Sequence, residues 1–217
     1  MKKLSIIDAG FLMMESRETP MHTGSFNLFT LPKGADEQEF LHGLADGLRT
    51  AEELQSPFGE KLKVGARGML GPLYWEKDTS LDLDYHIRHS ALPKPGRFRE
   101  SFALVSRLHG TLLDRNRPLW EMHLIEGLPE RQFAVYAKFH HAALDGVGTA
   151  HLLQSMWSTD PDGRIHYSPL SMAARERYVA TLGVDAPAEQ ELRNVAEALK
   201  ATFDSSANLL GALRKYV

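Results

Sequence analysis

Two adjacent histidines and an acidic residue lie close together in the stretch His140-His141-Ala142-Ala143-Leu144-Asp145-Gly146. A histidine ring with an ordinary pKa of about 6.5 is mostly neutral at neutral pH, so it can accept a proton from a hydroxyl group. A carboxylate such as Asp145 can fix the tautomer of an imidazole, bind an arginine, or cap the start of a helix. This combination of residues predicts a site for general acid–base chemistry.

The residues before the histidine pair alternate in the manner of a β-strand. One parity leads through Lys138 to His140, and the other is apolar and leads to His141. The apolar parity consists of Phe133, Val135, Ala137 and Phe139. Beyond Gly146, apolar residues recur at helical spacing, at Val147, Ala150, Leu153 and Trp157. We therefore expect a strand over 133–141 and a helix over 147–157, with His141 on the apolar face of the strand.

Other chemistries fit the sequence less well. A zinc site made by His140, His141 and Asp145 is conceivable, but adjacent residues of a strand point to opposite faces, which makes joint ligation awkward. The stretch 146–151 begins like the dinucleotide-binding pattern GxGxxG, yet its sixth residue is a histidine. Neither a GxSxG nucleophile elbow nor an HExxH zinc motif occurs, and the absence of cysteine excludes a thiol acyl-enzyme. We expect neither a metal nor a bound cofactor.

Composition sets broader bounds. With 217 residues, of which 43% are hydrophobic, the chain can bury one large domain or one and a half. The net charge of −3, with both signs interspersed, gives no basic surface for nucleic acid. No apolar run approaches the ~20 residues of a membrane span, and Asp8 and Glu15 interrupt the apolar residues near the N-terminus. These features predict a cytoplasmic protein that does not bind nucleic acid.

The rest of the sequence alternates between patterns typical of strands and of helices. Strands are predicted at 21–31, 61–66, 73–77, 121–126 and 133–141, with a turn at 127–130 joining the last two. Helices are predicted at 36–54, 98–113, 171–182 and 188–203, and 82–91 is predicted to be extended. The helix at 98–113 carries one apolar face, made by Phe102, Val105, Leu108 and Leu112.

The histidine stretch resembles the HHxxxDG signature of the CoA-dependent acyltransferase superfamily, which includes chloramphenicol acetyltransferase, carnitine acyltransferases and condensation domains of peptide synthetases. Two further stretches resemble the bacterial wax ester synthase/diacylglycerol acyltransferase family. They are 118–128, which begins Pro118-Leu119-Trp120, and 4–12, which is followed by Pro20-Met21-His22. The resemblance covers about residues 4–157. It implies an α+β fold, an α/β sandwich like chloramphenicol acetyltransferase, in which a mixed sheet flanked by helices forms one half of a two-half architecture.

The same resemblance implies an O-acyltransferase that moves a long-chain acyl group from acyl-CoA to a fatty alcohol, to diacylglycerol, or to both. His141 matches the general base of the family, and His140 is the less certain member of the pair. Asp145 matches a carboxylate with a structural role, commonly exerted through an arginine, and Gly146 leaves space beside the site. Acyl-CoA is then a substrate, and no cofactor is implied.

The chain changes character after Trp157, where turn-forming residues begin. We expect an N-terminal acyltransferase domain at 1–157, a linker at 158–170, and a helical segment at 171–217 that leads to a C-terminal half of the same protein. The apolar substrates also imply peripheral contact with the inner membrane or with lipid inclusions.

Two alternatives stay open at this point. His140 and Asp145 also fit the HxxxxD spacing of glycerolipid acyltransferases, although those enzymes usually carry membrane-anchoring segments that this sequence lacks. The second alternative is a non-catalytic binding module that keeps an inactive acyltransferase fold.

Overall fold

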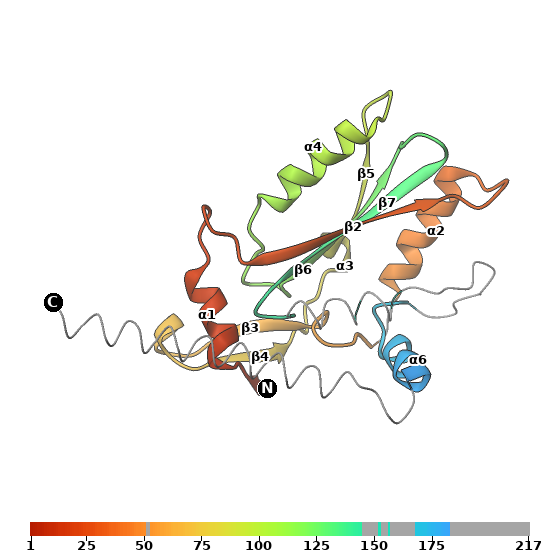
Figure 1. Ribbon diagram of the computed structural model, residues 1–217. Coiled ribbons are helices and arrows are strands. Elements are labelled where there is room, and N and C mark those ends of the chain that lie inside the picture. Colours follow the sequence, from red (N-terminus) through yellow and green to blue (C-terminus); the bar gives the residue numbers. More distant parts are fainter. Residues whose placement is uncertain (51–52, 145–151, 153–155, 157–167, 183–217) are drawn as a thin grey trace. The chain divides into compact units, whose positions relative to one another are not determined.

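The structure is a computed structural model that describes residues 1–50, 53–144, 152, 156 and 168–182 (Figure 1). The chain divides into two compact units, Met1–Arg177 and Tyr178–Val217, and every strand that the structure describes belongs to the first. The elements follow in the order β1 (Lys2–Lys3), α1 (Ile6–Met14), β2 (His22–Thr30), α2 (Glu37–Arg49), β3 (Glu60–Val64), η1 (Gly68–Leu70), β4 (Leu73–Lys77), α3 (Leu83–His86), β5 (Ile87–Ala91), α4 (Phe98–His109), β6 (Trp120–Glu126), β7 (Gln132–His140) and α6 (Met172–Leu182).

The first unit is built on a four-stranded sheet in the order β2-β7-β6-β5. β7 is antiparallel to both neighbours, with His22 of β2 opposite His140, and Trp120 of β6 opposite Phe139. β5 runs parallel to β6, so the sheet is mixed. Figure 1 shows α2 and α4 on opposite sides of this sheet. A mixed sheet flanked by helices confirms the predicted α+β class.

Both faces of β7 are buried, and the predicted alternation separates them. The parity of Phe133 and Phe139 joins the core that contains Leu41 and Leu48 of α2. The parity of Tyr136 joins a smaller core against α4. Burying a large apolar side chain contributes about 1.5–3 kcal/mol relative to exposing it, so these two cores fix β7 as the central strand.

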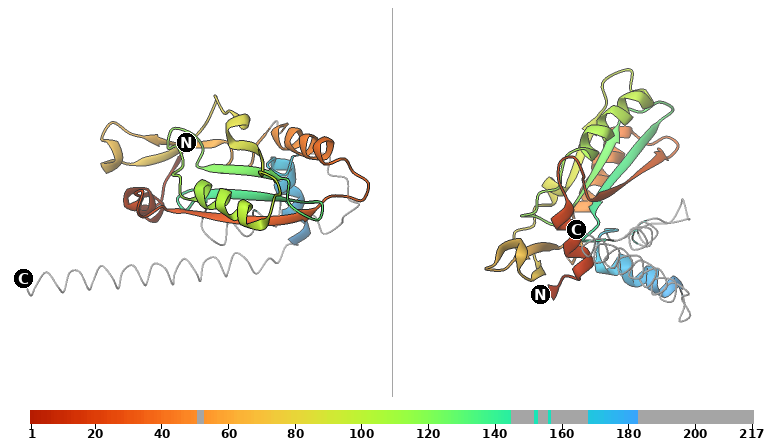
Figure 2. Two further views of the ribbon diagram at one scale, coloured as in Figure 1. Left: turned by 90° about the horizontal axis from the view of Figure 1, so that it is seen from above. Right: turned by 60° about the vertical axis from the view of Figure 1, so that its left-hand side comes forward.

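A smaller antiparallel sheet, in the order β1-β4-β3, packs with α1. Figure 2 shows α1 beside the β3–β4 hairpin. Leu12 of α1, Trp75 of β4 and Leu119 before β6 are all buried in this cluster, together with Ala142 just after the histidine pair. The N-terminal helix is therefore packed against the end of the large sheet where β7 stops.

Both long helices are shorter than the sequence predicted. α2 ends at Arg49 and not at residue 54. Directly after Arg49, the Thr50 hydroxyl donates to the Gly47 carbonyl over 2.8 Å, and this bond competes with continuation of the helix. α4 ends at His109, not at residue 113, because Gly110 follows and glycine disfavours a helical interior.

The packed face of α4 also differs from the prediction. Val105 and Leu108 pack against the sheet as predicted, and Leu104 joins them. Phe102 is 55% exposed, although its ring contacts Phe26 of β2 with centroids 5.6 Å apart. The segment 82–91, predicted to be extended throughout, begins with the short helix α3. That helix forms because the Asp82 carboxylate caps its start by accepting the Tyr85 N–H over 3.2 Å.

Other predicted elements are confirmed. β2, β4, β6 and α6 lie within one residue of their predicted bounds, and β3 within two. The helix predicted at 188–203 lies outside the described residues, as does most of the helix predicted at 147–157. Within the latter, Leu152 and Met156 are helical and buried in the core against α2. None of the helices in the described part of the chain has both the length and the hydropathy needed to span a bilayer.

A buried lysine joins α4 to the central strand. Lys138 is 0% exposed, and its Nζ donates to the carbonyls of Leu108 and Thr111 over 2.8 and 2.7 Å, which satisfies the end of α4. The same Nζ lies 3.5 Å from the buried carboxylate of Glu121 on β6. Burial alone would raise the pKa of Glu121, but His123 and Lys138 outweigh it and bring that pKa below its ordinary value.

Replacing Lys138 should therefore destabilise the fold strongly. Lys138→Met keeps most of the side-chain volume but leaves Glu121 buried without its cation and the end of α4 uncapped. We expect the free energy of unfolding, measured in urea, to fall by about 3–5 kcal/mol. The exposed cross-strand pair Lys63–Glu76 provides the control, since Lys63→Met should cost less than about 1 kcal/mol. Similar losses in both variants would contradict a structural role for the buried lysine.

Candidate active site

The backbone of the histidine pair is held from both sides of β7. The His140 N–H donates to the Leu119 carbonyl over 3.0 Å, and the His141 N–H donates to the Met21 carbonyl over 2.9 Å. The two N–H groups point toward opposite neighbours of β7, so one bond reaches the β6 side and the other the β2 side. Three stretches that are distant in the sequence, around Met21, Leu119 and His141, thus meet at one point.

Trp120 anchors the β6 side of this arrangement. Its indole Nε1 donates to the Phe58 carbonyl over 3.0 Å, and its ring stacks on His86 with centroids 4.5 Å apart. The His86 ring also binds the Trp120 carbonyl through Nδ1 over 2.8 Å, and burial lowers the pKa of this histidine. Because Trp120 is fully buried and bonded at both ends, it fixes the neighbouring Leu119 carbonyl that holds His140.

His140 is completely buried, and its surroundings fix its tautomer. Its Nδ1 accepts the Ala142 N–H over 2.9 Å, so Nδ1 carries a lone pair and the proton of the neutral ring is on Nε2. Nε2 faces the Glu15 carboxylate, with Oε1 3.3 Å away, although that contact is not well aligned for a hydrogen bond. Burial is the main cause that lowers the pKa of His140 to about 4, against the opposing influence of Glu15.

Glu15, which directly follows α1 as its C-cap residue, is the charged partner of this buried histidine. Its carboxylate is 0% exposed, accepts the Met21 N–H over 3.2 Å, and pairs with Arg115 Nη2 over 3.1 Å. Burial alone would raise the pKa of Glu15, but His140, the Met21 N–H and Arg115 outweigh it and bring that pKa below the ordinary value. Arg115 also donates to the Leu12 carbonyl over 2.6 Å, which ties it to α1.

Sequence reasoning did not identify Glu15 or Arg115 as site residues. In the sequence Glu15 is distinguished only as a charge that interrupts an apolar N-terminal run. That feature was the available signal, because an acidic residue directly after Leu12-Met13-Met14 requires a partner if the helix packs against a core.

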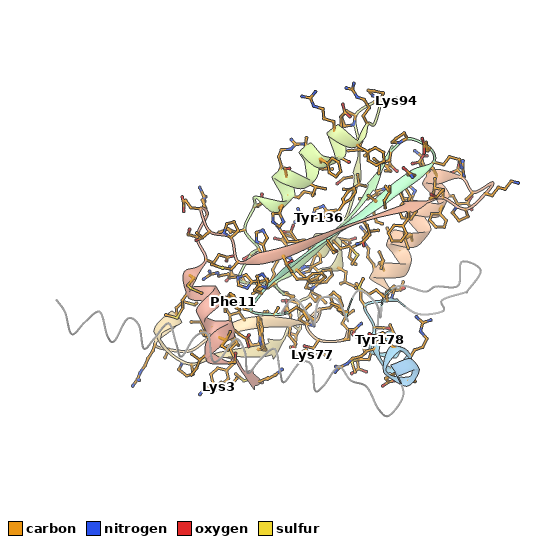
Figure 3. All side chains as sticks on the ribbon, in the orientation of Figure 1. Lys3, Phe11, Lys77, Lys94, Tyr136 and Tyr178 are labelled. Atoms are coloured by element: carbon orange, nitrogen blue, oxygen red, sulfur yellow. The ribbon has the colours of Figure 1, made fainter. Side chains whose placement is uncertain are left out.

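His141 lies one residue beyond the end of β7, whereas the sequence predicts it within the strand. The chain turns at this point, since the N–H groups of Ala143 and Leu144 both donate to the His140 carbonyl. The alternation of the strand therefore does not extend to His141. Its ring instead stacks on Phe11 of α1, labelled in Figure 3, with centroids 5.2 Å apart and an interplanar angle of 27°. His141 is partly exposed, in contrast to the fully buried His140.

The remaining predicted site residues, Asp145 and Gly146, lie outside the described residues. Among those that the structure describes, no group of three or more histidine, cysteine, aspartate or glutamate side chains could hold a metal ion. Two cavities, of about 400 and 380 Å³, are lined by other parts of the described chain and not by either histidine of the pair. The site thus contains a partly exposed histidine, His141, whose backbone is held by a neighbouring strand segment. An imidazole in such a place can transfer protons.

Comparisons with known proteins identify relatives of this chain. Residues 4–217 match the family model described as the wax ester synthase/diacylglycerol acyltransferase catalytic domain. A Mycobacterium tuberculosis protein named as a probable diacylglycerol O-acyltransferase is 47% identical over 155 residues, which are 71% of this chain and 34% of that protein. The O-acyltransferase WSD of Acinetobacter baylyi is 41% identical over 161 residues, 74% of this chain and 33% of that protein. The chain thus spans about a third of the length of these relatives.

Solved structures show the same relationship. The wax ester synthase/diacylglycerol acyltransferase from Marinobacter aquaeolei superposes with a TM-score of 0.72 at 42% identity, covering 80% of this chain and 41% of that one. The first condensation domain of the calcium-dependent antibiotic synthetase superposes with a TM-score of 0.54 at 16% identity, covering 71% and 36% of the two chains. The second likeness concerns the fold alone and confirms the predicted similarity in fold to the condensation domains of peptide synthetases.

The buried His140 should make stability depend on pH. Between pH 6.5 and about 4 the unfolded chain binds a proton at this residue that the folded chain does not. The free energy of unfolding should therefore fall as the pH falls through this window, by up to about 1.4 kcal/mol per pH unit.

His140→Asn tests this dependence, because its Oδ1 can still accept the Ala142 N–H but it does not titrate. In urea denaturation at pH 7, 6 and 5, the variant should lose less stability per pH unit than the wild type. His42→Asn, at an exposed position, should keep the wild-type dependence. Parallel curves for the wild type and His140→Asn would rule out a proton uptake linked to this ring.

Proposed function

The chain belongs to the wax ester synthase/diacylglycerol acyltransferase family, and we propose that it carries the general base, His141, of an acyl-CoA-dependent O-acyltransferase. The enzyme would move a long-chain acyl group from acyl-CoA to a fatty alcohol, giving a wax ester, or to diacylglycerol, giving triacylglycerol. One observation carries the assignment: His141 is partly exposed, while its backbone N–H is bound to the Met21 carbonyl and its ring stacks on Phe11.

In the proposed reaction both substrates meet beside His141. The imidazole takes the hydroxyl proton as the alcohol oxygen attacks the thioester carbonyl. The tetrahedral intermediate then collapses, the carbon–sulfur bond breaks, and the imidazolium returns the proton to the departing CoA thiolate. No covalent acyl-enzyme forms, and general-base catalysis of this kind accelerates a reaction about 10²–10⁴-fold.

The environment of His140 supports His141 as the base. One ring nitrogen of His140 accepts the Ala142 N–H, the other faces Glu15, and the ring is 0% exposed. A substrate hydroxyl would have to displace one of these partners to reach it. His140 therefore suits an orienting role, which weakens the HxxxxD alternative based on His140 and Asp145. We propose that Asp145 has the structural role implied by the family, and that Gly146 leaves space beside the base.

The substrate class follows from the family and from the physics of apolar binding. A long apolar slot gains about 0.8 kcal/mol for each methylene that it buries, so acyl chains of similar length should be accepted similarly. We propose that a C-terminal half of the same protein completes the passage, since the relatives are about three times as long as the matched region. The division into 1–157, 158–170 and 171–217 and a cytoplasmic location with peripheral membrane or lipid-inclusion contact belong to the same proposal.

Acyl transfer from palmitoyl-CoA to hexadecanol, and separately to a diacylglycerol, tests the assignment. His141→Ala in the protein that carries this chain should lower kcat by about 10²–10⁴ with a melting temperature close to the wild type. His42→Ala, at an exposed site on α2, should have wild-type activity. Wild-type kcat in a folded His141→Ala variant would defeat the assignment, and loss confined to a folded His140 variant would transfer the role to His140.

A further inference from the structure

We infer that Glu15 is a positioning residue for the histidine pair, holding the end of β7 so that the His141 ring is presented in one orientation. This inference rests on the proposed function of His141. The described contacts of Glu15 support it because they reach both histidines, one through its ring and the other through its backbone.

The backbone route consists of two hydrogen bonds that share one residue. Glu15 Oε1 accepts the Met21 N–H over 3.2 Å, and the Met21 carbonyl accepts the His141 N–H over 2.9 Å. Met21 directly precedes β2, whose first residue, His22, lies opposite His140. The Glu15 carboxylate therefore holds the residue whose carbonyl binds the backbone of the proposed base.

The ring route uses the spacing of residues on α1. Phe11 and Glu15 are four residues apart, so their side chains emerge from the same side of the helix end. Phe11 stacks on the His141 ring, and Glu15 Oε1 lies 3.3 Å from Nε2 of His140. A single helix thus contacts both imidazoles, and a shift of its C-terminal end would move both contacts together.

The two acceptor oxygens of the Glu15 carboxylate are both needed, as well as the size of its side chain. The carboxylate is 0% exposed and uses its two oxygens for different donors, Oε1 for the Met21 N–H and Oε2 for Arg115. An amide of the same size has one acceptor oxygen and one NH₂ donor. Glu15→Gln would therefore leave either Met21 or Arg115 facing another donor, beside a side chain that is itself fully buried.

The matched control lies three residues further along the chain. Glu18 is exposed and binds the Ser16 hydroxyl over 3.0 Å, and its described contacts do not include either histidine. Glu18→Gln makes the same chemical change as Glu15→Gln without touching the proposed positioning contacts.

The experiment combines steady-state kinetics with NMR spectra of the histidine rings and amides. In Glu15→Gln we expect kcat for transfer to hexadecanol to fall at least about tenfold, because small misplacements of a reacting group are costly, while KM for palmitoyl-CoA changes less than twofold. The His141 amide signal should shift and its ring signals should broaden or double. Glu18→Gln should match the wild type in every measurement. Should Glu15→Gln fail to fold, Glu15→Asp retains the charge but shortens the reach, and the same changes are expected.

Two results would overturn the inference. One is a folded Glu15 variant with unchanged His141 signals and wild-type kcat. The other is a loss of kcat that only parallels a fall in melting temperature, with the His141 signals of the folded fraction unchanged. If His141→Ala retained full activity the proposed function would fail, but the spectra of the Glu15 variants would still decide whether Glu15 orients the pair.

Discussion

The arrangement of the site depends on two backbone hydrogen bonds at the end of the central strand. They tie His140 to Leu119 on one side and His141 to Met21 on the other, so neither histidine can move without disturbing a neighbouring strand. Both bonds can form because β7 lies between β2 and β6 and continues beyond Phe139, its last residue that pairs with β6. The central position of β7, in turn, follows from the burial of both of its faces.

The two histidines have the same chemistry and adjacent positions but different environments. His140 is desolvated and its tautomer is set by the Ala142 N–H, so its pKa falls to about 4 and it stays neutral. His141 is the first residue of the turn that follows the strand; it is partly exposed, and its ring stacks on Phe11. A difference of one residue at the end of a strand thus separates a histidine suited to orientation from one suited to proton transfer.

Buried charged side chains lie around this strand. Lys138, Glu121 and Glu15 are all enclosed, and each has a charged partner or backbone groups that compensate its desolvation. Such groups stabilise a fold less than apolar packing does, but removing one partner leaves an uncompensated charge. They therefore favour one relative placement of α1, α4 and β7, which is the placement that brings the histidine pair to the end of the sheet.

The sequence alone determined the elements whose causes are local. The alternation of residues 133–139 predicted a strand with two distinct faces, and the three short motifs pointed to the family. The tertiary structure decided what depends on neighbours distant in the sequence: the burial of His140, the stacking of His141 on Phe11, and the role of Glu15. No local pattern could show that the end of α1 packs beside the end of β7, because that contact joins segments far apart in the sequence and the entropy cost of closing such a long loop is offset by packing elsewhere in the fold.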